Sequence, residues 1–217
     1  MGNTSINLDL KNIWHCYHLF RRGKKVTKEL DHFQYHLEEN LYQLYLDLNN
    51  DTYQHGYYRE FEVIDNKKRQ IKVACIRDRV IHRLLYEYLY PIYDPTFVFD
   101  VWSCRAEKGL IGAIERTQKF MYRNSSGFIW RADIEKFFDN VDQDTLVHIL
   151  ARIIKETKAM NLLKKVINNY SVSNRERERE RERVKSSAGT AFPLATSPAR
   201  FSPIFISMNL TDISNTI

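Results

Sequence analysis

The sequence predicts an α+β fold, and three observations lead to that prediction. Apolar residues recur at three- and four-residue steps over residues 10–48, which is typical of amphipathic helices. Two short runs of β-forming residues flank a polar turn between residues 61 and 73, which indicates a hairpin. A third, mainly apolar run at residues 128–132 ends at the lone carboxylate of Asp133, which indicates a further strand.

The helices are expected to begin and end at recognisable signals. A polar residue between Ser5 and Asp9 could cap the first helix, which ends at a basic turn at residues 21–25. A second helix over residues 27–49 carries leucines at helical spacing and precedes the hairpin. Asp142 is a candidate N-cap, with contact to a metal ion as the alternative role of its carboxylate. Later helices are expected at residues 79–90, 110–122, 143–155 and 159–169.

Composition describes a chain that is large enough for a core and basic enough to attract phosphates. Of its 217 residues 43% are hydrophobic and 13% aromatic, which suffices for one ordinary domain. A net charge of +6 favours a nucleic-acid partner, because Lys and Arg neutralise backbone phosphates. No apolar run reaches the length of a bilayer helix and no signal peptide is recognised, so we expect a cytoplasmic protein without membrane contact.

Residues 128–142 carry the most specific motif, an apolar run followed by Asp133 and two aromatics. This segment resembles the first catalytic motif of reverse transcriptases. The resemblance implies that Asp133 binds Mg²⁺ and that Phe138, five positions later, packs against the sugar of the incoming nucleotide. A carboxylate suits the first role because Mg²⁺ prefers oxygen ligands and one carboxylate can bridge two ions.

The likeness continues upstream, where several blocks follow in the order of the fingers region of bacterial reverse transcriptases. These blocks are residues 69–73, 76–83, 89–97, 102–109 and 113–116. The enzymes most similar in pattern are those of diversity-generating retroelements or the group II-like type. The resemblance covers residues 35–170 and implies a right-hand polymerase that is truncated, with fingers and only the first part of the palm.

Three arginines in the block that resembles the fingers are candidate nucleotide-binding residues. Arg69, Arg77 and Arg79 would hold phosphate oxygens of the triphosphate or the template, because a guanidinium presents two parallel donors. Ordinary surface ion pairing is the alternative role for these side chains.

A second catalytic signature of the family, Tyr-x-Asp-Asp, is absent from the 217 residues. Two-metal phosphoryl transfer needs several converging carboxylates, and Asp133 alone cannot fix the geometry of the ions. We therefore expect this chain by itself to be inactive as a polymerase.

The last segment has a different character from the rest of the chain. Arg and Glu alternate over residues 175–183, a pattern that predicts a solvated, disordered linker, with an exposed charged helix as the alternative. Back-translation of residues 191–212 in another frame gives a sequence close to the next palm motif, so residues 191–217 are interpreted as out of frame. The expected division is therefore 1–57 (helical), 58–126 (fingers-like), 127–170 (start of the palm) and 171–217 (charged repeat and tail).

Two functions follow from this sequence. The first is an RNA-directed DNA polymerase of a bacterial retroelement, present as a truncated chain. Its cofactor would be Mg²⁺, and its partners an RNA template, a DNA primer or product, deoxynucleoside triphosphates and a retroelement accessory protein. The second is a non-catalytic RNA-binding remnant of such a protein.

Overall fold

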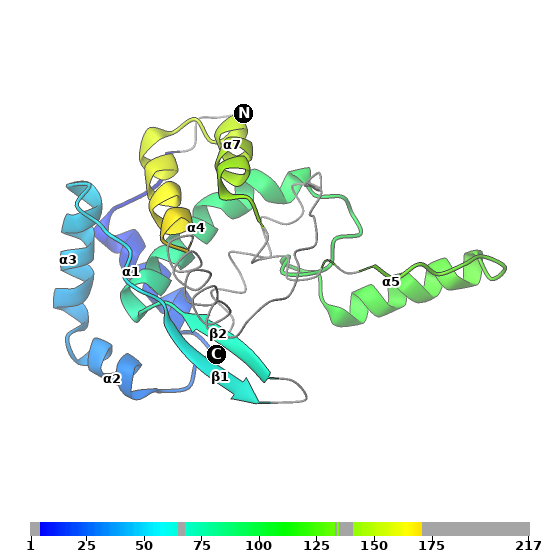
Figure 1. Ribbon diagram of the computed structural model, residues 1–217, viewed down its shortest axis with the longest axis horizontal. Helices are drawn as coiled ribbons and strands as arrows, with labels where there is room; N and C mark the ends of the chain where they lie inside the picture. The colour runs from blue at the N-terminus through cyan, green and yellow to red at the C-terminus, as the bar shows by residue number, and fades with distance from the viewer. Residues whose placement is uncertain (1–4, 65–67, 133, 135–140, 171–217) are drawn as a thin grey trace, which may run out of the picture.

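The computed structural model describes residues 5–64, 68–132, 134 and 141–170. Helices predominate, and a single antiparallel hairpin is the sheet of this part of the chain (Figure 1). This confirms an α+β fold at the level of class, while the right-hand polymerase architecture stays a prediction. The elements are α1 (Leu10–Arg21), α2 (Lys28–Tyr35), α3 (Leu37–Asn49), β1 (Arg59–Ile64), β2 (Lys68–Val73), α4 (Ile76–Tyr93), a 3-10 turn (Asp94–Thr96), α5 (Leu110–Arg123), α7 (Gln143–Ile153) and a last helix at residues 157–170.

Helix α4 forms the centre of the core. It is three residues longer at each end than the predicted helix, and Pro91 near its end is tolerated within the last turn. Helix α1 packs along it through Ile13, Cys16 and Tyr17, and α3 adds Leu41 and Leu44. Each such side chain contributes about 1.5–3 kcal/mol on full burial. Helix α4 therefore contributes a large share of the buried apolar surface of the described fold.

The helix predicted over residues 27–49 is in fact two helices, α2 and α3. The break falls at His36, whose φ and ψ of −110° and 34° leave the helical region. The Asn40 side-chain amide donates to the Phe33 carbonyl over 3.1 Å, which satisfies a carbonyl at the end of α2. At the other end of α2 the Thr27 hydroxyl accepts from the Leu30 amide at 3.2 Å and caps the helix, as its position predicts.

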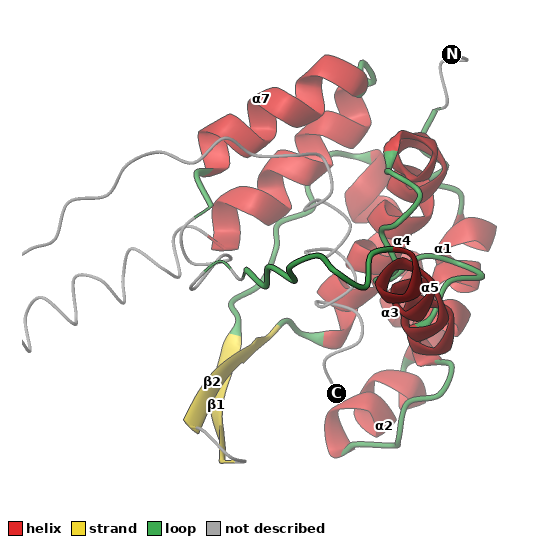
Figure 2. Cartoon of the chain, turned by 90° about the vertical axis from the view of Figure 1, so that its right-hand side faces the viewer, coloured by secondary structure: helices red, strands yellow, loops and turns green. Residues whose placement is uncertain are grey.

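The predicted hairpin is present, and it extends from the helical body in Figure 2. Phe61 opposes Ile71 on one face of the hairpin, and Glu60 opposes Lys72 on the other. Lys72 Nζ lies 4.0 Å from the Glu60 carboxylate across the strands. Lys72 Nζ also lies 4.8 Å from the centre of the Tyr170 ring, so this residue links the hairpin to the last helix.

The strand predicted at residues 128–132 is absent. These residues have no regular secondary structure and are exposed, with the Trp130 side chain 89% accessible. A strand needs a partner for its backbone hydrogen bonds, and no described residue pairs with this segment. Helix α5 and residues 124–132, here called the arm, together project from the body (Figure 1).

Helix α7 and the helix at residues 157–170 form a pair on the far side of the core from α2. The Asp142 carboxylate accepts from the Thr145 backbone amide at 3.1 Å, which confirms its predicted role as an N-cap. Glu156 between the two helices accepts from the Ile6 amide at 2.7 Å and from the Ser5 hydroxyl at 3.0 Å. These bonds tie the start of the described chain to its end.

Candidate functional site

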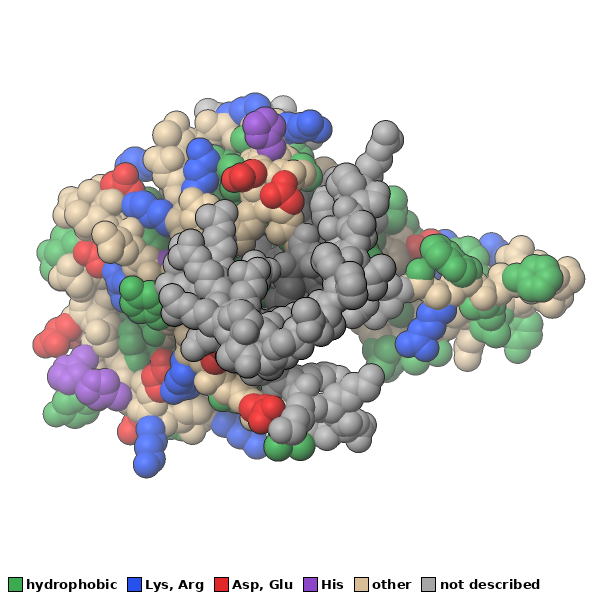
Figure 3. Space-filling model, viewed as in Figure 1, with side chains coloured by type: hydrophobic (Ala, Val, Ile, Leu, Met, Phe, Trp, Pro, Cys, Tyr) green, Lys and Arg blue, Asp and Glu red, His purple; other side chains and the backbone are tan. Residues whose placement is uncertain are grey.

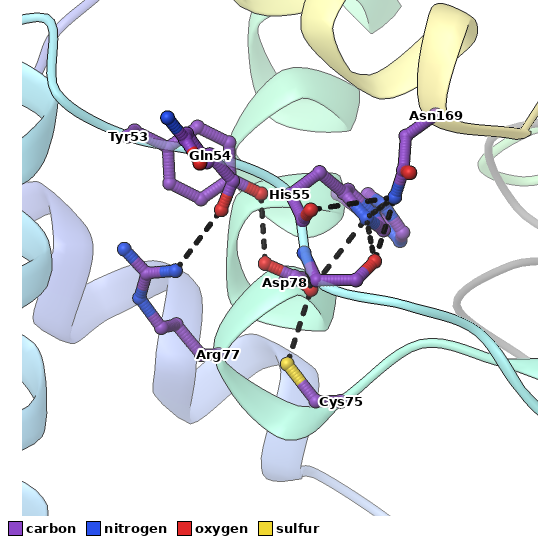
Figure 4. A network of polar contacts seen from close by, with 9 residues as sticks. Tyr53, Gln54, His55, Cys75, Arg77, Asp78 and Asn169 are labelled. Atoms are coloured by element: carbon purple, nitrogen blue, oxygen red, sulfur yellow. Dashed lines mark hydrogen bonds and ion pairs between the residues drawn. The ribbon is translucent and has the colours of Figure 1, made fainter. Parts of the chain in front are cut away.

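A closed set of buried polar groups surrounds the first turn of α4, here called the Asp78 network. Its members are Tyr53, His55, Gly56, Cys75, Asp78, His82 and Asn169. Asp78 is fully buried and accepts three bonds: from the Tyr53 hydroxyl at 2.9 Å, the Gly56 amide at 2.9 Å and the Cys75 thiol at 3.1 Å (Figure 4). Three donors on one buried carboxylate satisfy its hydrogen-bonding capacity.

Two histidine rings continue the network inward from Asp78. His55 Nε2 lies 2.9 Å from His82 Nε2, and the rings stack with centroids 5.1 Å apart. His55 Nδ1 lies 2.7 Å from the Gly56 carbonyl, and a hydrogen bond joins the two rings when one of the facing Nε2 atoms carries the proton. Burial, aided by the charges of His55 and Arg79, lowers the pKa of His82 to about 3. His82 is therefore neutral in the folded protein.

Asn169 connects the last described helix to the same network. Its side-chain amide lies 2.6 Å from both the Gly56 carbonyl and His55 Nδ1. Three segments that are far apart in the sequence, at residues 53–56, 75–82 and 169, thus meet at one point. Nothing in the spacing of these residues predicted that they would meet.

The Asp78 network has the properties of a structural hydrogen-bond network. Burial and the nearby Asp78 charge raise the pKa of Tyr53 above its usual range and that of Cys75 to about 12, so both groups stay protonated and donate. The side chains of His55, Asp78 and His82 have almost no exposed surface, which excludes a substrate from them. The network orders the segment between α3 and β1, which leads into the hairpin.

Arg77, one of the three predicted nucleotide contacts, lies at the edge of this network. Its guanidinium donates to the Asp47 carboxylate at 2.5 Å and to the Gln54 carbonyl at 3.2 Å. The same group lies 5.0 Å from the centre of the Tyr53 ring. Arg77 therefore has the intramolecular ion pair that was the alternative to phosphate binding, and its nucleotide role stays a prediction.

The other two arginines are separated from Arg77. Arg79 is 7% exposed and its guanidinium lies 4.8 Å from the Phe20 ring, between α4 and α1. Arg69 opposes Val63 in the hairpin, and its side chain lies outside the described part. Arg77 and Arg79 thus have different surroundings, and the roles of all three arginines as nucleotide ligands stay predictions.

The two palm positions lie outside the described residues. Asp133 and Phe138 both fall there, so the predicted metal and sugar contacts stay predictions. Within the described ranges, no group of three or more His, Cys, Asp or Glu side chains could hold a metal ion. The same part of the chain has no helix long and apolar enough to cross a membrane.

Cations and aromatic rings alternate where the chain leaves α4 and enters the arm. Lys108 Nζ lies 4.0 Å from the Phe99 ring centre and 4.9 Å from that of Trp102. Arg116 lies 4.5 Å from the Phe120 ring and binds the Asp100 carboxylate at 2.8 Å. The block that resembles the fingers pattern at residues 102–109 thus folds into a compact loop on which α5 begins.

Charge is mixed on the visible surface. In Figure 3 Lys and Arg side chains lie beside Asp and Glu over the helical body, and hydrophobic side chains cover much of the arm. The exposed hydrophobic residues of the arm are Leu110, Ile111, Ile114, Phe120, Met121, Tyr122, Phe128, Ile129 and Trp130. A nucleic-acid interface therefore cannot be assigned from net charge alone.

Comparison with known proteins gives distant, partial similarity. No family model matches the chain. It is 27% identical over 111 residues, 50% of its length, to an uncharacterized 91 kDa protein in a cob intron of Schizosaccharomyces pombe. It is 24% identical over 90 residues, 41% of its length, to nuclear intron maturase 1, mitochondrial, of Arabidopsis thaliana. The matches span 13% and 12% of those proteins, so the chain has a coarse relationship to intron-encoded proteins and intron maturases.

Proposed function

We propose that this chain is the fingers-type, RNA-binding part of a reverse transcriptase-related protein of an intron, and that it does not polymerise DNA by itself. The observation that carries the proposal is the agreement of two independent similarities. The motif at residues 128–142 and the upstream blocks resemble reverse transcriptases, and the two partial relatives are named for introns.

The intron relatives bear on which type of retroelement this chain resembles. Of the retroelement types that the sequence resembles, the group II-like type fits the intron relatives better than the diversity-generating type. The bacterial origin and the cytoplasmic location stay predictions, since one relative is named as mitochondrial. The accessory protein and the deoxynucleotide partners are likewise proposed from resemblance alone.

The role proposed for the described fold is to present a rigid basic surface to RNA. The Asp78 network fixes the segment that leads into the hairpin, and the contacts of α4 hold the helices behind it. An ordered surface binds with less entropic cost than a flexible one.

The test is a binding titration of the purified chain with a structured intron RNA and with a DNA duplex of equal length. We expect RNA binding that weakens as salt increases, because phosphate contacts release counterions. A primer-extension assay on the same material should give no product. Absence of RNA binding at low salt would contradict the proposal.

An extension product that disappears in Asp133→Asn would contradict the second half of the proposal. That variant replaces the predicted metal ligand by an uncharged side chain of the same size. Asp144→Asn is the matched control, because Asp144 is exposed in the first turn of α7. Loss of product in Asp133→Asn alone would mean that the chain is an active polymerase.

A further inference from the structure

Cations concentrate where α1 turns into α2. The segment at residues 21–28, here called the basic turn, joins the two helices. With the first turn of α2, residues 21–31 carry five Lys and Arg side chains against two carboxylates, Glu29 and Asp31. This is a local positive excess, whereas charge is mixed over the helical body on the face that Figure 3 shows.

The positive charge continues inward from the basic turn. Lys24 Nζ lies 5.1 Å from the Phe20 ring centre, and the Arg79 guanidinium lies 4.8 Å from the same ring. Two cations therefore share one buried ring. Burial lowers the pKa of Lys24, and the Arg79 charge lowers it further, because the two positive charges repel each other.

The Nε donor of Arg79 has no hydrogen-bond acceptor among the described residues. The Arg79 side chain is 7% exposed, and this Nε atom is buried. Arg21 Nε, at the start of the basic turn, is in the same state. A guanidinium remains protonated in proteins, and a buried charge without a full set of acceptors is unfavourable.

The carboxylate that acts on Arg79 is shared with a second arginine. Glu29 is the carboxylate that acts on Arg79, and it is also bound at 3.2 Å by Arg59 of β1. Asp31 is exposed in the first turn of α2. Glu29 is therefore shared between Arg59 and Arg79.

Three further cations lie at the outer edge of the basic turn. Arg22, Lys25 and Lys28 are exposed, and among the described residues none of them forms an ion pair or a hydrogen bond through its side chain. Long cations in this state can reach a ligand without breaking an internal contact. They differ in this respect from Arg77, Arg105 and Arg116, which are each held by a carboxylate.

We propose that the basic turn, backed by Arg79 and flanked by Arg59, binds phosphate groups of an RNA backbone. The inference rests on the proposed function and adds where the RNA is held. The exposed cations extend over seven residues, which suits a chain of phosphates better than a single nucleotide. Phe20 is buried and its ring packs against Lys24 and Arg79, so it does not stack on a base. Binding at this site is therefore independent of base sequence.

The main test compares two triple variants in fluorescence anisotropy with a structured intron RNA at several salt concentrations. R22Q/K25Q/K28Q removes the outer cations of the basic turn. R152Q/K158Q/K164Q removes three exposed cations from α7 and the last helix, which lie at the opposite end of the body from α2 in Figures 1 and 2. We expect about tenfold weaker binding at 0.15 M salt and a salt slope lower by about 2–3 for the first variant. The control should lose less than about threefold in affinity, by long-range attraction alone.

A third variant tests whether RNA binding strengthens when a nearby carboxylate is removed. Glu29→Gln removes the shared carboxylate and keeps its size, so Arg59 and Arg79 become more available to phosphate. RNA binding should strengthen about two- to threefold, by loss of one nearby repulsive charge. Circular dichroism of each variant checks that the helices are intact, and all the outer cations are exposed, so their removal leaves the core unchanged.

The outcomes separate the two proposals. A chain that binds no RNA overturns the proposed function and this inference with it. A chain that binds RNA, but loses equal affinity in both triple variants, overturns only the assignment to the basic turn. A parallel titration with a deoxynucleoside triphosphate completes the test. Weaker triphosphate binding with unchanged RNA binding in R22Q/K25Q/K28Q would also overturn the RNA assignment.

Discussion

Helices α4 and α5 share an amphipathic pattern but differ in what covers them. In α4 eleven of eighteen residues are buried, and among these are Asp78, Arg79 and His82. In α5 none of the fourteen residues is buried, and large apolar side chains such as Ile111 face solvent. Periodicity alone therefore predicts that a helix forms, while the packing of its apolar face depends on a second surface.

The surroundings of α4 and the arm should also differ in how easily each opens locally. Around α4 apolar burial and the Asp78 network act together, so local opening requires loss of the whole core. The arm has few such contacts; Gly112 lies against Trp102 and Arg116 binds Asp100. An exposed apolar surface of this kind is typical of an interaction or aggregation site.

The largest effect is expected from Asp78→Ala. This change leaves the Tyr53 hydroxyl, the Gly56 amide and the Cys75 thiol buried without their acceptor, at a cost of about 3–5 kcal/mol. Urea denaturation followed by circular dichroism measures the change. Asp144→Ala, an exposed acid in α7, is the control and should cost about 0.5 kcal/mol. Equal costs for the two would show that the network adds no stability.

A pair of matched truncations tests the comparison of the helices themselves. Ile81→Ala in α4 removes fully buried atoms and should lower the free energy of unfolding by about 3 kcal/mol. Ile111→Ala in α5 removes exposed atoms and should change it by less than about 0.5 kcal/mol. A large loss for Ile111→Ala would mean that the arm is covered in solution.

Acid should destabilise the core through His82. The folded-state pKa of about 3 is below the unfolded value of 6.5, so the unfolded chain takes up the proton first. The contribution of neutral His82 to the free energy of unfolding is complete above pH 6.5. It falls by about 1.4 kcal/mol per pH unit between pH 6.5 and about 3. Denaturation at pH 7 and pH 5 measures it, and His82→Gln should flatten the dependence. An unchanged slope in His82→Gln would assign the acid sensitivity to other groups.

The smallest effect is expected where the arm joins the body. In Gly112→Ala the new Cβ would lie 2.6 Å from Trp102 Cζ3, so the indole ring or α5 must shift. Alanine also favours the helix by about 1 kcal/mol relative to glycine, which offsets much of the strain. Near-ultraviolet circular dichroism of the tryptophans should change while the denaturation midpoint stays nearly constant. A large fall in the midpoint would show that the joint belongs to the core.

Much of the fold followed from local signals, and the exceptions have physical causes. Periodicity predicted the helices, and two runs of β-forming residues around a polar turn predicted the hairpin, since both depend on near neighbours. The break at His36 depends on a side-chain bond from Asn40 that no periodic pattern reveals. The strand at residues 128–132 was wrong because a strand requires a partner, which no described segment supplies.

The site was less predictable than the fold. Arg77 and Arg79 were selected by family resemblance, but their contacts with Asp47 and Phe20 depend on how α4 packs on α3 and α1. The Asp78 network joins residues up to 114 positions apart, and no spacing rule connects His55 with Asn169. The positive charge of the basic turn was visible in the sequence, whereas only the structure showed that Arg22, Lys25 and Lys28 form no side-chain ion pair among the described residues.

Hydrogen exchange of the free and RNA-bound chain tests the central claim most directly: an ordered α1–α4 body that binds RNA through the basic turn and carries an uncovered arm. In the free chain, amides of α4 should exchange at least about a hundredfold more slowly than those of α5. Structured intron RNA should add protection to peptides that cover residues 21–31 and leave the arm unchanged. Added protection confined to residues 110–132, with none in the basic turn, would contradict it.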